Sequence, residues 1–183
     1  MADQFLLPNH SLPDRVDLGC GPAKVEGCFG VDHHPYPGVD QIVDFDTPPW
    51  PIKDSSFDVI YARHIIEHVA SIPDFMGEIH RIGRHNGLVQ IITPHFSSIN
   101  SWDDPTHRWH LGCNWSSIFT EQYLAAQFPK FEHVSTDLFF APNSLNGLIA
   151  KTIIKVKSRQ WWEKNCAFVV RARNIHTVLR IKK

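Results

Sequence analysis

The sequence lacks the features that define three classes of protein. Its four cysteines include no Cys-x-x-Cys pair and no dense framework, so we expect reduced thiols and no disulfide scaffold. No stretch approaches the ~20 apolar residues that span a bilayer. Residues 1–13 lack a basic start followed by an apolar core, so we expect no secretory signal there and a cytoplasmic location.

Net charge is also nearly absent, at −1, but the charges are unevenly distributed. Residues 151–183 hold ten Lys and Arg and one acid. A basic end suggests an anionic substrate, an acidic surface or another subunit, although a solvated face is the simpler alternative. The 43% hydrophobic content predicts one globular domain over residues 1–183, with residues 1–13 as a loose arm.

A short apolar run at residues 16–22 ends in a carboxylate and then breaks into Gly-x-Gly. Glycines in such a turn allow positive φ and let the backbone approach a ligand. Three further apolar runs contain or end in acids, at 29–32, 42–44 and 57–61. Successive strands of this kind predict the carboxyl edge of a doubly wound α/β sheet, where such folds bind ligands.

The remaining elements follow from spacing and periodicity. Only ten residues separate Leu18 from Phe29, too few for a crossover helix, so we expect a turn or one helical turn at 22–26. Residues 83–87 are expected to end a helix and to separate it from the following strand. Helices are predicted near 65–69, 72–82, 116–128 and 145–156. Further strands are predicted at 41–43, 88–93 and 131–140, and an antiparallel edge strand at 177–181.

Several of these motifs, in order, resemble class I S-adenosylmethionine-dependent methyltransferases, in the branch with a Leu-Glu-His signature. The motifs are Asp17-Leu18-Gly19-Cys20-Gly21, Val31-Asp32, Asp44-Phe45, Pro49-Trp50, Ser56 to Tyr61 and Ile65-Ile66-Glu67-His68. They cover roughly residues 14–95. The resemblance implies a Rossmann-like methyltransferase sheet, mostly parallel with an antiparallel C-terminal edge strand, and S-adenosyl-L-methionine as the methyl donor.

The resemblance also implies a donor site at the strand ends. Gly19 and Gly21 would approach the amino-acid tail, and Asp17 would bind its ammonium directly or through water. Asp32 would accept both ribose hydroxyl hydrogens. The adenine would bind through the Asp44 carboxylate and the Phe45 backbone N–H. The other residues placed in this site are Cys20, His33, Arg63 and His64, of which His64 would face the methyl group. The alternative is that the acids merely cap turns.

Two competing motifs are less consistent with the sequence. A nicotinamide site needs a third glycine where Lys24 stands and an acid about 20 residues on, whereas Asp32 follows Gly21 by 11. Thr47-Pro48-Pro49-Trp50 resembles the Asn-Pro-Pro-Tyr element of enzymes that methylate nucleobase or glutamine nitrogens. It follows the third strand and lacks the Asn, which argues against that chemistry.

Residues 64–68 spell His-x-x-Glu-His, an inverted zinc-protease signature. Two histidines at this spacing can share a helix face and bind zinc. The motif follows an Asp-Val-Ile-Tyr strand, however, where similar methyltransferases carry Leu-Glu-His. We therefore predict no metal and interpret Glu67 and His68 as a structural pair.

The long irregular segment 94–115 is predicted to be the acceptor-site loop, because such loops are usually functional. We predict His107 as a general base oriented by Asp104, with His95 as a further catalytic residue near the acceptor. The residues expected to bind the acceptor are Arg108, Trp109 and Trp102. An Asp-Pro turn with surface histidines is one alternative, and a divalent metal on Asp103, Asp104, His107 and His110 is another.

The predicted function is methyl transfer from S-adenosylmethionine to oxygen or nitrogen of a small molecule. The alternatives are transfer of another group from the sulfonium, or a non-catalytic partner or regulatory protein. Residues 141–165, with Trp161-Trp162, would form a basic amphipathic insert or a lid, with contact to a membrane surface or a second copy of the chain left open. Nucleic acid is not an expected partner, since basic and aromatic residues interleave only near Trp161.

Overall fold

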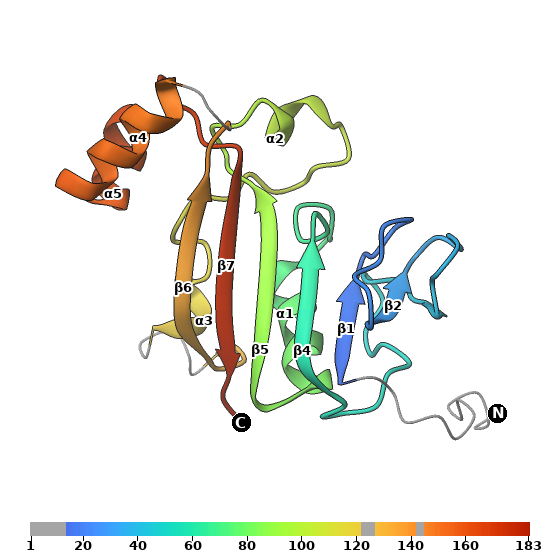
Figure 1. Ribbon diagram of the computed structural model, residues 1–183. Coiled ribbons are helices and arrows are strands. Elements are labelled where there is room, and N and C mark those ends of the chain that lie inside the picture. Colours follow the sequence, from blue (N-terminus) through green and yellow to red (C-terminus); the bar gives the residue numbers. More distant parts are fainter. Residues whose placement is uncertain (1–13, 122–126, 142–144) are drawn as a thin grey trace.

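The computed structural model describes residues 14–121, 127–141 and 145–183, so the arm predicted at 1–13 lies outside the described residues. Seven strands form one sheet in the order β3-β2-β1-β4-β5-β7-β6 (Figure 1). The strands are β1 (Arg15–Leu18), β2 (Phe29–Asp32), β3 (Gln41–Ile42), β4 (Phe57–Arg63), β5 (Gly83–Pro94), β6 (Phe131–Phe139) and β7 (Asn174–Ile181). This order reverses between β1 and β4, which makes the carboxyl ends of these strands the expected ligand site.

The first five strands are parallel, and β7 runs antiparallel to both β5 and β6. The mostly parallel sheet with an antiparallel C-terminal strand is therefore confirmed. Its predicted position at the edge is corrected, because β7 lies inside the sheet and β6 forms the edge. The burial explains the order: alternate residues of β7 are fully buried, including Ile175 and Leu179, whereas most of β6 is exposed or half-buried.

Helix α1 (Ile72–Ile82) covers the face of the sheet that lies behind β4 and β5 in Figure 1. The Ser71 hydroxyl caps its first turn by accepting a hydrogen bond from the Asp74 N–H, and Pro73 suits the start of a helix. Its apolar face is buried in the core, as the sequence predicts, through Phe75, Met76, Ile79 and Ile82. The other helices are α2 (Asn100–Asp103), α3 (Ser117–Thr120), α4 (Leu145–Val156) and α5 (Arg159–Cys166).

Three local predictions need correction. Residues 65–69 form turns and no helix, because the backbone carbonyl of Glu67 accepts hydrogen bonds from the loop at Arg108 and Trp109. Strand β5 begins at Gly83, directly after α1, so residues 83–87 do not separate the two elements. Within 116–128 the described residues are helical only at 117–120, and 122–126 lie outside the description. A turn without a helix joins β1 to β2, as expected.

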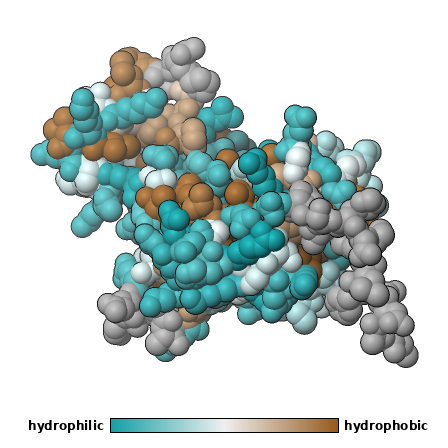
Figure 2. Space-filling model, turned by 60° about the horizontal axis from the view of Figure 1, so that its bottom comes forward, coloured by the Kyte–Doolittle hydropathy of each residue, from teal (hydrophilic) through white to brown (hydrophobic). Residues whose placement is uncertain are grey.

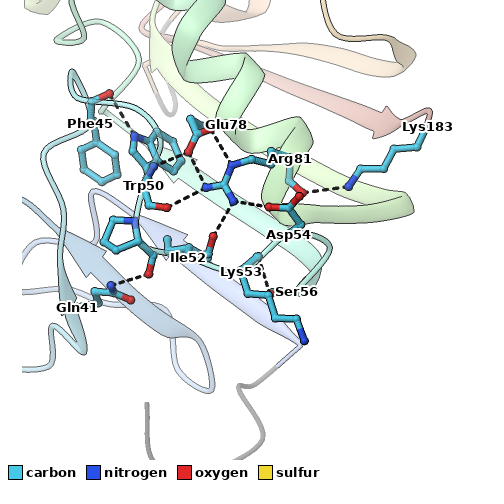
Figure 3. A network of polar contacts seen from close by, with 11 residues as sticks. Gln41, Phe45, Trp50, Ile52, Lys53, Asp54, Ser56, Glu78, Arg81 and Lys183 are labelled. Carbon is cyan, nitrogen blue, oxygen red and sulfur yellow. Dashed lines mark hydrogen bonds and ion pairs between the residues drawn. The ribbon is translucent and has the colours of Figure 1, made fainter. Parts of the chain in front are cut away.

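A buried polar network fixes the segment between β3 and β4 onto α1 (Figure 3). Glu78 accepts a hydrogen bond from the Trp50 N–H at 2.6 Å and from Arg81 at 2.6 and 2.8 Å. Arg81 also donates to the backbone carbonyls of Trp50 and Ile52 and to Asp54. The Trp50 ring then packs edge-on against Phe45 at 5.3 Å. The network thereby holds Phe45 near the carboxyl edge of the sheet.

Helices α4 and α5 lie beyond the carboxyl end of β6 and the amino end of β7 (Figure 1). Helix α4 forms where the sequence predicts a helix, and Leu145, Leu148 and Val156 on it are exposed; apolar surface gathers over this part of the molecule (Figure 2). Trp161 is exposed, whereas Trp162 is fully buried in a small core of its own. Among the described residues, none of the helices is both long and apolar enough to cross a membrane.

Candidate functional site

The turn after β1 uses both glycines in the left-handed region, with φ of 66° at Gly19 and 53° at Gly21. A Cβ added at Gly19 would lie 2.8 Å from the Cβ of Ile65, so only glycine fits there without a shift of the backbone. The Gly21 N–H donates to the Asp32 carboxylate at 2.8 Å. The turn is thus fixed against the ends of β2 and β4.

Asp17 lies beneath this turn. It is fully buried and accepts hydrogen bonds from Arg63 at 2.7 Å and from the Val25 N–H at 2.8 Å. Arg63 also donates to the Ala23 carbonyl. Two of the predicted donor-site residues therefore form an ion pair that shapes the turn. This burial argues against direct contact between Asp17 and the donor ammonium. Of the two predicted contacts, the water-mediated one remains.

Asp32 ends β2 and is almost completely buried, with its two oxygens accepting from the N–H groups of Gly21 and His34. Each carboxylate oxygen retains a lone pair for a further hydrogen bond. His33 is exposed beside it, with its Nδ1 3.4 Å from an Asp32 oxygen. Cys20 is buried here, and burial, together with Asp17 and Asp32, raises the pKa of its thiol to about 11. The thiol is consequently neutral at physiological pH.

A crevice opens beside these residues and is lined by His33, Asp44, Phe45, Asp46, Ile65, His68 and Val69. Asp44 is exposed, and hydrogen bonds from the Thr47 hydroxyl and the Asp46 N–H lower the pKa of its carboxyl. Phe45 is buried at the crevice wall. The structure thus brings Asp44 and Phe45 together with His33, and His33 connects them to Asp32.

These residues fit S-adenosylmethionine. The glycine turn lets the protein main chain approach a ligand closely. The carboxylates can accept hydrogen bonds from hydroxyl and amino groups of the ligand. The crevice also has apolar walls at Ile65 and Val69. When bound, this cofactor supplies an electrophilic methyl group on a sulfonium.

A second and larger hollow, of about 640 Å³, lies between the end of β4 and the loop 94–115. Its lining residues are His64, Glu67, His68, Pro94, Asn100, Asp103, Asp104, Pro105 and His107. The loop, which carries α2, extends beyond the ends of β5 and β4 (Figure 1). His64 stands at the end of β4 with a left-handed φ of 55°, a strained conformation that clusters at functional sites.

Two predicted catalytic residues line this hollow. His107 lies with its Nε2 3.8 Å from an Asp104 oxygen, and its Nδ1 is 3.1 Å from the Ser101 carbonyl, to which it must donate. Hydrogen bonds from the Thr106 hydroxyl and N–H lower the pKa of Asp104. The proximity of His107 and Asp104 agrees with the predicted pairing, although Thr106 contacts Asp104 more closely, at 2.6 Å.

His95 is not among the described residues that line this hollow, which corrects its predicted place near the acceptor. His95 is fully buried and bridges the Ser97 hydroxyl, at 2.7 Å, and the Glu163 carboxylate, at 3.0 Å. It lies directly after β5, and its backbone forms an isolated bridge with Leu111. A histidine just past a strand was the signal in the sequence. This signal does not reveal whether the imidazole ring lines the hollow or is buried in the protein.

The predicted acceptor-binding residues instead anchor the loop in this structure. The Trp109 indole N–H donates to the Val69 carbonyl at 2.8 Å, and Arg108 lies 3.6 Å from Asp46. Trp102 is exposed and stacks on His110 at 3.6 Å between ring centroids. None of Trp102, Arg108 and Trp109 is among the described residues that line the hollow.

Two lining residues, Glu67 and His68, are not part of the predicted site, because the sequence indicates a structural pair there. The His-x-x-Glu-His pattern was the signal that pointed to them. His68 lines both the donor crevice and the larger hollow. The two hollows therefore adjoin at one side chain.

Comparison with known proteins agrees with this arrangement. A methyltransferase domain family matches residues 3–132. Among solved structures, an S-adenosylmethionine-dependent methyltransferase from Archaeoglobus fulgidus is 17% identical with a TM-score of 0.62, over 91% of this chain and 85% of the other. One from Mesorhizobium loti is 14% identical with a TM-score of 0.59, over 95% and 93% of the two chains.

The YcgJ protein of Bacillus subtilis is also similar, at 15% identity and a TM-score of 0.58, over 95% and 93%. The curated protein sequences contain no match. At such low identities the structural matches show the fold alone, whereas the family match spans well over half of the chain. The chain therefore belongs to the methyltransferase domain family and is a class I S-adenosylmethionine-dependent methyltransferase.

Proposed function

We propose that this enzyme transfers the methyl group of S-adenosylmethionine to an oxygen or nitrogen of a small molecule bound beneath the loop 94–115. The observation that supports this proposal is the shared side chain of His68, which lines both the donor crevice and the larger hollow. A methyl group at the junction would be within reach of an acceptor in the larger hollow. Proximity and alignment of this kind supply much of the acceleration of a displacement reaction.

The proposed donor contacts are those given by the strand ends. Asp32 accepts the ribose hydroxyls through its remaining lone pairs, and Asp44 and Phe45 bind the adenine. The turn at 19–21 binds the amino-acid tail with Cys20 as a neutral wall, while Arg63 positions the turn through Asp17. His33 borders the ribose, and His64 faces the methyl group.

The reaction is an in-line displacement at carbon. A lone pair of the acceptor attacks the methyl carbon while the carbon–sulfur bond breaks and its electron pair goes to sulfur. An acceptor hydroxyl loses its proton in the same process. His107 is placed to accept it, since its Nδ1 is occupied as a donor to Ser101 and its Nε2 carries the lone pair in the neutral ring.

The donor site is tested by calorimetry with S-adenosylhomocysteine, the demethylated donor, on the full chain. Asp32→Ala removes the ribose acceptor and should weaken binding by about 100-fold or more, since hydrogen bonds to charged groups contribute about 1.5–3 kcal/mol each. The matched control is Asp58→Ala, an exposed acid at the opposite end of β4 in an ion pair with Arg84. Equal affinity in the two variants would remove Asp32 from the donor site.

The reaction itself is tested by mass spectrometry of small-molecule acceptors incubated with enzyme and S-adenosylmethionine. Methyl transfer adds the mass of one methylene group to the acceptor and releases S-adenosylhomocysteine. Release of methylthioadenosine would instead indicate transfer of a different group from the sulfonium. Donor binding without any product from hydroxyl and amine acceptors would favour a binding or regulatory role.

We also propose that the chain is one domain in which residues 141–165 are an anchored insert. Trp162 is fully buried and packs edge-on against Phe140 at 5.4 Å. Burial of this ring supports a fixed insert more than a moving lid. The exposed apolar residues of α4, next to lysines, leave contact with a membrane surface or another chain as a further proposal.

A further inference from the structure

Glu67 is a buried carboxylate that its surroundings leave unsatisfied. The residue is fully buried, and its Oε1 lies 3.2 Å from the Nδ1 of His64. Its Oε2 is also buried and has no hydrogen-bond partner among the described residues. An unpaired buried carboxylate oxygen is costly, so its retention calls for a partner that a protein-only structure does not contain.

Two imidazoles stand next to this carboxylate. A ring nitrogen of His68, a ring nitrogen of His107 and a carboxylate oxygen of Glu67 all lie within 4.8 Å of one another. The main chain enforces this approach, because the N–H groups of Arg108 and Trp109 donate to the Glu67 carbonyl at 2.8 and 3.3 Å. All three side chains line the larger hollow.

Hydrogen bonds at the Nδ1 of each ring orient the two histidines. His107 donates from Nδ1 to the Ser101 carbonyl, which leaves the lone pair on Nε2. The Thr106 hydroxyl donates to Asp104 at 2.6 Å and therefore accepts from the Nδ1 of His68 at 3.0 Å. His68 is then also left with its lone pair on Nε2. Outer hydrogen bonds that fix the tautomer in this way accompany histidines that bind metals.

From these contacts we infer that Glu67, His68 and His107 bind a divalent first-row transition-metal ion in the larger hollow. Two imidazoles and one carboxylate form a three-ligand set that suits ions such as Zn²⁺, Fe²⁺, Mn²⁺ or Co²⁺ and leaves coordination positions open. This site departs from the metal-free prediction made from the sequence. It also differs from the alternative set of Asp103, Asp104, His107 and His110, with which it shares His107, because it takes its other two ligands from the turn after β4.

The charges suggest what occupies the open positions. One carboxylate and two neutral imidazoles leave a divalent ion with a net charge of +1, which an anionic oxygen neutralises. This step depends on the proposed function: the acceptor would be a hydroxyl compound whose oxygen binds the ion, which lowers the pKa of the O–H group. The hydroxyl proton leaves to solvent, the oxygen attacks the methyl carbon, and sulfur takes the electrons of the broken bond. His107 would then act as a ligand and not as a free base.

The test is a titration of the full chain, stripped with chelator, with Co²⁺ followed by visible absorption and with Zn²⁺ followed by calorimetry. We expect one ion per chain. Loss of a residue that only hydrogen-bonds to a metal ligand weakens metal affinity by about 10- to 100-fold. Glu67→Gln, His68→Ala and His107→Ala should each weaken metal affinity by more than this. The matched control is His110→Ala, on the same loop but stacked on Trp102, and it should retain the affinity of the unaltered chain.

Binding of S-adenosylhomocysteine, measured on the same samples, separates this inference from the proposed function. Glu67→Gln and His107→Ala, which do not touch the donor crevice, should retain it, which shows that they fold. Metal affinity that is unchanged in Glu67→Gln and His107→Ala would overturn the metal site while leaving donor binding intact. A near-ultraviolet charge-transfer band from sulfur to Co²⁺ would also overturn it, because it would place the ion on a cysteine.

Discussion

Two clusters of histidine and carboxylate lie at the carboxyl edge of this sheet, and they differ in how completely the protein satisfies them. In the first, His95 and Glu163 join Cys113, with ligand-type atoms that also lie within 4.8 Å of one another. In the second, Glu67 meets His68 and His107. Both clusters have the composition of a metal site, so composition alone does not distinguish them.

Hydrogen bonding does distinguish them. The His95 Nδ1 accepts from the Ser97 N–H, so its Nε2 donates to Glu163, and the same Glu163 oxygen accepts from the Cys113 N–H at 2.7 Å. Burial also raises the pKa of the Cys113 thiol to about 12, which keeps it protonated. The first cluster is complete without a ligand, whereas Glu67 retains an unpaired oxygen. Of these two clusters, the second is therefore the one that offers an unpaired oxygen to a ligand, and the inferred metal site rests on that difference.

The largest effect is expected from breaking the complete cluster. Glu163→Ala leaves the buried His95 ring and the Cys113 N–H without their acceptor. We expect a loss of about 2–4 kcal/mol in the free energy of unfolding, measured by urea denaturation. S-adenosylhomocysteine binding by the folded fraction should not change. Loss of donor binding with normal stability would contradict the structural role.

A smaller effect on stability is expected in the unsatisfied cluster. Glu67→Gln removes a buried charge that has no full complement of partners. In metal-free protein we expect the free energy of unfolding to stay within about 1 kcal/mol of the original value or to rise. Thermal denaturation in the presence of chelator measures it. A loss as large as that of Glu163→Ala would mean that Glu67 is satisfied after all and would weaken the contrast.

The smallest expected effect is a pH dependence confined to the complete cluster. Burial raises the pKa of Glu163, but hydrogen bonds from His95 and the Cys113 N–H outweigh it, so the pKa lies below its ordinary value of 4.5. A carboxyl with a lowered folded-state pKa stabilises the protein well above pH 4.5 and loses that contribution as the pH falls. The stability difference between the original chain and Glu163→Gln should therefore shrink in acid.

Chemical denaturation at a series of pH values measures this difference. The control is Glu26→Gln, an exposed position in the turn before β2, which should give a difference near zero throughout. A difference that grows as the pH falls would show that the folded-state pKa of Glu163 is raised and not lowered.

Much of the fold was predictable because local patterns determine it. The apolar runs that end in acids gave β1, β2 and β4, and the ten-residue spacing correctly excluded a crossover helix before Phe29. The helix expected at 65–69 was wrong, because its backbone bonds to a loop some 40 residues away, a contact that no local pattern contains. The edge position of β7 was wrong for a similar reason, since the order of strands depends on the burial of both β6 and β7.

The site was predictable in its residue types and less so in its grouping. Asp44, Phe45 and His33 meet in one crevice as expected, and His107 lies beside Asp104. His95 was assigned to the wrong cluster, because two histidines on one loop can face opposite sides. The role of Glu67 depended on a missing hydrogen bond, which only coordinates reveal.

The connection between β1 and β2 also determines how charge is recognised at the turn. A helix that begins at such a turn offers an anion the positive end of its dipole together with a row of N–H groups. Here no helix begins there, and one positive charge next to the turn is the guanidinium of Arg63, which is already paired with Asp17. A carboxylate that binds at this place meets a point charge that is one-third exposed, so added salt should compete with it more than it would with a buried dipole.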